Sequence, residues 1–111
     1  MGIALGGCAG AMPSEQLAAT PSLQQRIEAA HTRGDHEKLE AYYRGEAAAA
    51  RAKVEEHRDM IKAYERQVAG GRSNHNMATH CLSLIQSYES IATDYERLAA
   101  NHRQMADQAL R

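Results

Sequence analysis

Tyrosine, histidine and methionine recur in this chain at a fixed spacing, and they are the side chains best suited to chemistry. The pattern Leu-x3-Tyr-x13-His-x2-Met occurs twice, with the matching residues Leu39/Leu84, Tyr43/Tyr88, Ala47/Ala92, His57/His102 and Met60/Met105. Imidazole and thioether groups ligate metals, and an imidazole beside a phenol can relay a proton or share a hydrogen bond. The repeat therefore predicts two related sites, whose chemistry depends on what the fold brings together.

A second group of candidate ligands follows a glycine-rich segment. His75, Met77, His80 and Cys81 supply imidazole, thioether and thiolate groups, which together favour Cu(I). Met77 and Cys81 share a helical face, whereas the adjacent His80 and Cys81 point in different directions. Cys81 can ligate a metal, bridge two subunits through a disulfide, or simply be buried as a small apolar residue. All three interpretations stay open from the sequence.

Other cofactors and reactions fit the sequence less well. Histidine and methionine can hold haem between helices, yet there is no Cys-x-x-Cys-His motif, and haem binding is the weakest of the three functional alternatives. Carboxylate-bridged metal pairs need Glu-x-x-His motifs on two helices, and the sequence has only Glu28-x-x-His31, with none in the two expected long helices. Phosphate loops, nucleotide fingerprints and nucleophile elbows are also missing from the sequence. We therefore expect a non-enzymatic protein with no cofactor, or with copper alone.

Composition and breaker residues predict an all-α fold. The 111 residues suit one domain, proline occurs only at positions 13 and 21, and the net charge of -1 argues against nucleic-acid binding. Thr20-Pro21-Ser22 should open a short helix that stops at Gly34. Asp35 should then cap a helix over about 36–68, and the glycines at 70 and 71 should break the chain. Asn74 or Asn76 should cap a last helix that runs to about residue 110.

The two long helices should pair as an antiparallel hairpin, because the connection between them is short. Steps of four and three define a stripe on each helix. The first stripe is His36, Glu40, Tyr43, Ala47, Ala50, Val54, His57, Ile61, Tyr64 and Val68. The second is Met77, Cys81, Leu84, Tyr88, Ile91, Tyr95, Leu98, His102, Met105 and Ala109. This register pairs His57 with Tyr88 and Tyr43 with His102, which we interpret as buried, hydrogen-bonded polar layers or, alternatively, as metal sites.

A further row on the last helix predicts self-association. Ala78, Ile85, Ala92, Ala99 and Ala106 follow one another at seven-residue spacing, and small side chains let another helix approach closely. The short first helix can cover only part of a hairpin about 50 Å long. We therefore expect a homodimer with a four-helix core, with a monomeric three-helix bundle as the alternative. Charged residues such as Arg44, Arg51, Glu55, Arg58 and Glu96 are typical of a solvated helix face.

The first residues resemble a bacterial lipobox. Leu5-Gly6-Gly7-Cys8 is similar to the site where a lipoprotein signal is cut and the new N-terminal cysteine is lipidated. The resemblance implies that residues 1–13 are a signal remnant and tether, and that 14–111 form the helical domain. Only seven residues precede Cys8, fewer than a signal peptide needs, so the signal looks truncated. The alternative is a plain Gly/Ala-rich tail.

A lipidated Cys8 would place the protein in the periplasm. Ala9 stands where many inner-membrane lipoproteins carry aspartate, so the resemblance implies anchoring at the outer membrane. The resulting expectation is a small bacterial lipoprotein that works as a structural or protein-interaction bundle. Periplasmic copper binding through His57, Met60, His75, Met77, His80, Cys81, His102 and Met105 is the alternative function.

Overall fold

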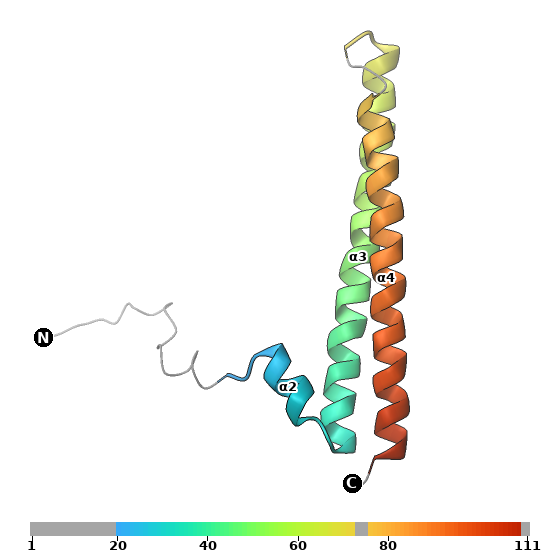
Figure 1. Cartoon of the computed structure of the whole chain (residues 1–111). Helices are drawn as coiled ribbons and strands as arrows, with labels where there is room; N and C mark the ends of the chain where they lie inside the picture. The colour runs from blue at the N-terminus through green and yellow to red at the C-terminus, as the bar shows by residue number, and fades with distance from the viewer. Residues whose placement is uncertain (1–19, 73–75, 110–111) are drawn as a thin grey trace, which may run out of the picture. The chain divides into compact units, whose positions relative to one another are not determined.

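The computed structural model describes residues 20–72 and 76–109, and these residues form helices and no strand. The order is α2 (Leu23–Ala29), α3 (Arg33–Ala69) and α4 (Asn76–Gln108). The chain divides after Ala30 into two compact units, the first containing α2 and the second the two long helices. Figure 1 shows α3 and α4 side by side along their lengths, as an antiparallel hairpin. The predicted all-α hairpin with a short preceding helix is therefore confirmed.

The start of α2 follows from local capping chemistry. The Ser22 hydroxyl accepts a hydrogen bond from the Gln25 backbone N–H, and the Gln25 side chain accepts one from the Ser22 N–H. This reciprocal capping box satisfies two of the backbone donors that a helix start leaves free. The helix ends at Ala29, five residues before the predicted stop at Gly34.

A second capping box starts α3 and explains that error. The Thr32 hydroxyl accepts from the Asp35 N–H, while the Asp35 carboxylate accepts from the N–H groups of His31 and Thr32. Asp35 is thus the third residue of the helix and not its cap, and Gly34 lies inside the first turn. The backbone donors of His31 and Thr32 lower the pKa of Asp35 to about 2.

Two glycines end α3, as the sequence predicts. Gly70 is the C-cap, and its N–H donates to the carbonyl of Arg66. Gly71 has a φ of 74°, a left-handed conformation that glycine adopts without steric cost. The chain then reverses into α4, which begins at Asn76, while the alternative cap Asn74 lies outside the described residues.

The hairpin core differs from the predicted stripe on α4. The buried residues of α3 are His36, Leu39, Tyr43, Ala47, Ala50, Val54 and His57, close to expectation, with Leu39 in place of Glu40. Those of α4 are Cys81, Ile85, Ala92, Ala99, His102 and Ala106. The row of small residues that we assigned to a dimer interface therefore packs against α3 within one chain. That row, Ala78, Ile85, Ala92, Ala99 and Ala106, is called the alanine row below.

Conversely, five large apolar residues predicted to be buried lie on the surface. Met77, Leu84, Ile91, Leu98 and Met105 have between 38% and 43% of their surface exposed. These five residues, spaced seven apart on one side of α4, are called the α4 ridge below. The central row Cys81, Tyr88, Tyr95 and His102 is shared by the predicted and the observed core. The helix is thus rotated about its own axis relative to the prediction, by one row.

Ion pairs between the helices accompany this rotation. The guanidinium of Arg51 donates two hydrogen bonds to Glu96, at 2.8 and 3.0 Å, and Arg58 lies 3.3 Å from Glu89. At the open end of the hairpin Arg103 pairs with Glu37 at 3.3 Å. The hydrogen bonds from Arg51 hold the pKa of Glu96 below its ordinary value. Residues that we interpreted as an ordinary solvated face therefore bridge the two helices along one side.

Candidate functional site

A cluster of buried rings lies at the open end of the hairpin, where α3 begins and α4 ends. The Nδ1 atoms of His36 and His102 are 3.1 Å apart, and the two imidazoles stack with centroids 5.3 Å apart. Tyr43 also stacks on His102 at 5.6 Å, and on Tyr95 at 6.0 Å. A hydrogen bond of 3.1 Å between the two Nδ1 atoms requires that one of them carries a proton and the other accepts it.

The electrostatics of this cluster favour the neutral form of His102. Burial lowers the pKa of His102, and the charge that His36 can carry lowers it further. Both imidazoles are more than nine-tenths buried. Protonation of both imidazoles would remove the acceptor of the hydrogen bond and place two like charges side by side. The cluster therefore has the properties of a packed polar layer.

The second predicted layer pairs His57 with Tyr88, and the structure brings these rings together. Their centroids lie 5.7 Å apart with an interplanar angle of 18°, which is a stacked arrangement. The expected hydrogen bond is wrong: the buried His57 Nδ1 atom has no hydrogen-bond partner. Tyr88 therefore contacts His57 through ring stacking, without a hydrogen bond to this nitrogen. Tyr43 and His102 likewise stack, with an interplanar angle of 19°.

The internal repeat therefore gives similar positions and different chemistry. His57 and His102 are both 8% exposed, but only His102 has a hydrogen-bonding partner. The difference arises from His36, whose counterpart in the repeat is Cys81. Leu39 and Leu84 differ as well, since the first is 1% exposed and the second 43%. No direct signal in the sequence predicts the His36–His102 contact, because the predicted register places these two residues in different layers.

The predicted metal ligands are spread over several surroundings. Cys81 is buried with a free thiol, whereas Met77, His80 and Met105 are exposed and Met60 is half-buried. His75 and the predicted lipidation residue Cys8 lie outside the described residues. Within residues 20–72 and 76–109, no three His, Cys, Asp or Glu side chains are grouped to hold a metal ion. Copper binding stays a prediction from the sequence.

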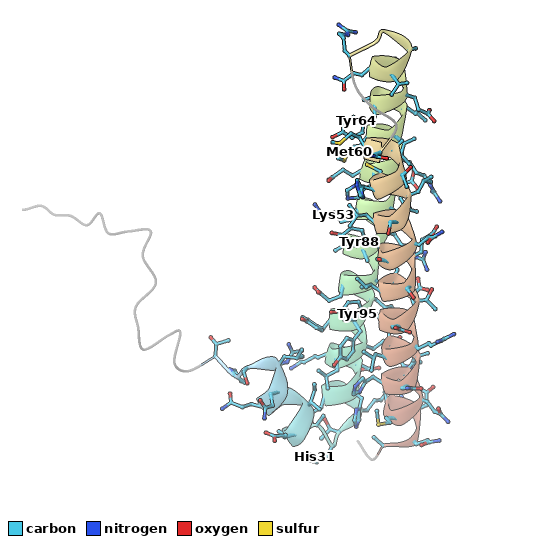
Figure 2. The ribbon with its side chains drawn as sticks, turned by 45° about the horizontal axis from the view of Figure 1, so that its top comes forward. His31, Lys53, Met60, Tyr64, Tyr88 and Tyr95 are labelled. Carbon is cyan, nitrogen blue, oxygen red and sulfur yellow. The ribbon has the colours of Figure 1, made fainter. Side chains whose placement is uncertain are left out.

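The two sides of the hairpin differ in character. One side carries the interhelical ion pairs, and the other carries the α4 ridge. Figure 2 shows side chains along the whole hairpin, including Met60, Tyr64, Tyr88 and Tyr95 at successive levels. On α4 the row beside the ridge, opposite its core side, is His80, Ser87, Asp94, Asn101 and Gln108. The ridge is thus a continuous apolar line beside a row with a single carboxylate.

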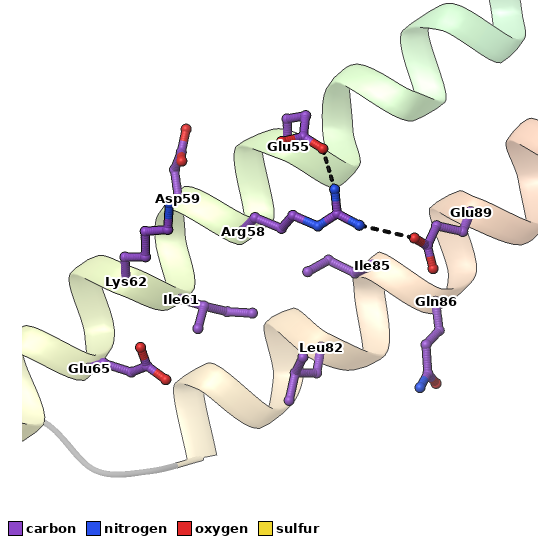
Figure 3. A pocket seen from close by; sticks show the side chains of 10 residues that line it. All are labelled: Glu55, Arg58, Asp59, Ile61, Lys62, Glu65, Leu82, Ile85, Gln86 and Glu89. Atoms are coloured by element: carbon purple, nitrogen blue, oxygen red, sulfur yellow. Dashed lines mark hydrogen bonds and ion pairs between the residues drawn. The ribbon is translucent and has the colours of Figure 1, made fainter.

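An open groove occupies the loop-proximal part of the charged side. Ile61, Leu82 and Ile85 form its apolar part, and charged residues of α3 and α4 surround them. Figure 3 shows Arg58 between Glu55 and Glu89, paired with both. Arg58 thus pairs with two of the four carboxylates that line the groove. No ion pair joins the lining residues Asp59, Lys62 and Glu65 to another described residue, so the lining carries more acidic than basic groups.

Comparisons with known proteins add no functional information. No protein-family model, curated protein or solved structure matches the chain. Among the helices described, none is both long and apolar enough to span a bilayer. The features that bear on function are therefore the α4 ridge, the charged side of the hairpin, and the buried ring layers at His57 and His102.

Proposed function

We propose that this protein is a non-enzymatic, lipid-anchored helical module of the cell envelope that acts through protein–protein contact. The observation that carries the proposal is the α4 ridge, in which Met77, Leu84, Ile91, Leu98 and Met105 repeat at seven-residue spacing. Single exposed apolar residues are common on proteins, whereas a contiguous apolar line is typical of an interaction surface. The ridge has the spacing with which helices pack against other helices.

The buried layers support a non-enzymatic role. His57 and His102 are the side chains best suited to acid–base chemistry, and both are 8% exposed. Each is covered by a stacked tyrosine at under 6 Å between ring centroids. A substrate would have to displace these rings to reach either imidazole. We therefore assign the histidines to core packing and the α4 ridge to binding.

Site-specific photocrosslinking in cells that produce the protein tests the binding role. A photoreactive residue at Ile91 should form adducts, whereas the same residue at the exposed Ser90, which points about 100° away from Ile91 around α4, should form none. Adducts at neither position, with the protein present at normal levels, would reject the ridge as an interaction surface.

The anchor is tested separately by fractionation. The lipobox-like Leu5–Cys8 motif supports lipidation of Cys8, and Cys8→Ser should move the protein from the membrane fraction to the fraction without membranes. An unchanged distribution would reject the lipid anchor without affecting the interaction role.

A further inference from the structure

We infer that the α4 ridge binds a second copy of this chain, with the two α4 helices antiparallel around a two-fold axis at Ile91. The inference rests on the proposed interaction role and names its partner. It replaces the expected dimer interface, because the alanine row that we assigned to dimerisation is occupied by α3.

The order of residues along the ridge is self-complementary. The ridge reads Met77, Leu84, Ile91, Leu98, Met105, which is the same sequence of side chains in both directions. A two-fold axis through Ile91 therefore places Ile91 against its own copy and Leu84 against Leu98 of the partner subunit. Met77 then meets Met105 of the partner subunit at each end. A closed two-fold dimer requires such a surface, since each copy presents the same patch.

Charge favours the antiparallel arrangement over the parallel one. In a parallel, in-register pair Asp94 of the flanking row would lie level with its own copy, so two like charges would face each other. In the antiparallel pair the two Asp94 residues are separated along the axis by several residues. The flanking row contributes His80, Ser87, Asn101 and Gln108 and no lysine or arginine. A membrane surface is a poorer occupant, because helices that lie on anionic lipid carry basic residues on the flanks of the apolar face.

The dimensions fit a second copy better than any described part of the same chain. The ridge spans residues 77–105, or about 42 Å at 1.5 Å per residue. The seven residues of α2 span only about 10 Å. A hairpin face two helices wide, at about 10 Å each, offers roughly 800 Å² over that length. That is about the area that each partner buries in a stable complex of standard size.

Cysteine crosslinking and sedimentation of the full chain test the inference. In a background of Cys8→Ser and Cys81→Ala, with helicity checked by circular dichroism, Ile91→Cys should form a disulfide-linked dimer on oxidation with diamide. The exposed Ser90→Cys should stay monomeric under the same conditions. A mixture of Leu84→Cys and Leu98→Cys chains should crosslink at least ten times more than either variant alone, since only the antiparallel arrangement joins these positions.

Two results would overturn the inference. One is efficient self-crosslinking of Leu84→Cys, which would indicate a parallel pair. The other is the combination of a monomer in sedimentation at a protein concentration of about 100 µM and no crosslink at Ile91. Photocrosslinked adducts of some other mass at Ile91 would then retain the interaction role and assign the ridge to a different protein. Conversely, a parent dimer that Ile91→Glu converts to a helical monomer, while Ser90→Glu does not, supports the inference.

Discussion

Replacing His57 with leucine should raise the free energy of unfolding, and the same replacement at His102 should lower it. The two residues hold matching positions in the repeat and are both 8% exposed. They differ because the His57 Nδ1 atom has no partner, whereas His102 shares a hydrogen bond with His36. The pair of variants thus compares one substitution in two packed layers that differ in a single polar contact.

The magnitudes follow from those contacts. A buried polar group without a partner costs about 1–3 kcal/mol, and His57→Leu removes that cost while losing a ring stack worth about 0.5–1.5 kcal/mol. His102→Leu loses the stacks with Tyr43 and His36 and leaves the buried His36 nitrogen without a partner, at a further cost of about 1–3 kcal/mol. The higher helix propensity and hydrophobicity of leucine act equally at both sites. The two unpaired-nitrogen contributions have opposite signs in the two variants, so we expect the variants to differ by roughly 2–6 kcal/mol.

Urea unfolding at pH 8, followed by circular dichroism, measures this difference. All proteins should be compared at one concentration, because self-association adds to apparent stability. The slopes of the unfolding free energy against urea should agree, so that only the midpoints move. If both variants shift in the same direction by similar amounts, the contrast between the two layers is wrong.

Three further predictions concern pH, the turn and the thiol. Burial and the charge of His36 lower the pKa of His102 in the folded protein, so the unfolded chain protonates this imidazole at a higher pH than the folded chain does. The free energy of unfolding should therefore fall as the pH drops below 6.5, and His102→Leu should make it less dependent on pH. Gly45→Ala, where an added Cβ meets nothing within 4 Å, should stabilise by about 0.5–1 kcal/mol, whereas Gly71→Ala, at a φ of 74°, should destabilise by about 1 kcal/mol in thermal melts. The Cys81 thiol, 4% exposed, should react with a maleimide slowly in buffer and rapidly in urea; equal rates would place it on the surface.

The hairpin could be predicted from the sequence because its signals are long and agree with one another. Heptad spacing runs through both halves, and the glycines at 70 and 71 interrupt it once. The boundary between the first two helices was misplaced because Gly34 was interpreted as a stop. The deciding interaction was the capping box of Thr32 and Asp35, whose two residues stand three apart. The sequence carries both signals, and the capping box, not the glycine, sets the boundary.

The ring layers could be predicted only in part. Register fixes which residues lie at the same level, so His57 with Tyr88 and Tyr43 with His102 followed from the pairing of the helices. Ring orientation depends on the packing of neighbouring side chains, and this turned the expected hydrogen bonds into stacks. The His36–His102 contact joins residues one heptad apart in that register, and long side chains at the open end can make such a contact.

The buried face of α4 could not be predicted from the sequence of α4 alone. Three adjacent rows on α4 are apolar or small, and any two neighbouring rows form an acceptable heptad stripe. Hydrophobicity alone ranks the leucine-rich ridge above the alanine row. Two features of α3 reverse this order. Its tyrosine and histidine rings need small residues on α4, and Ala92 and Ala99 provide them at 0% exposure. Its arginines at 51 and 58 form ion pairs with Glu96 and Glu89 in the observed rotation of α4.

The exposed α4 ridge and the buried alanine row therefore both follow from which face of α4 packs against α3. Turning α4 to bury Leu84 and Ile91 would separate Arg51 from Glu96 and would press leucines against the α3 rings. In the hairpin, one side of α4 packs against the α3 rings and pairs with the α3 arginines, and the larger apolar side chains of α4 lie in the area on the other side. Most of the hydrophobic free energy still available to α4 lies in that area, because alanine burial yields little compared with leucine or methionine. An additional helix is the partner that a seven-residue apolar spacing fits best, and this is why the ridge, more than the histidine layers, carries the functional argument.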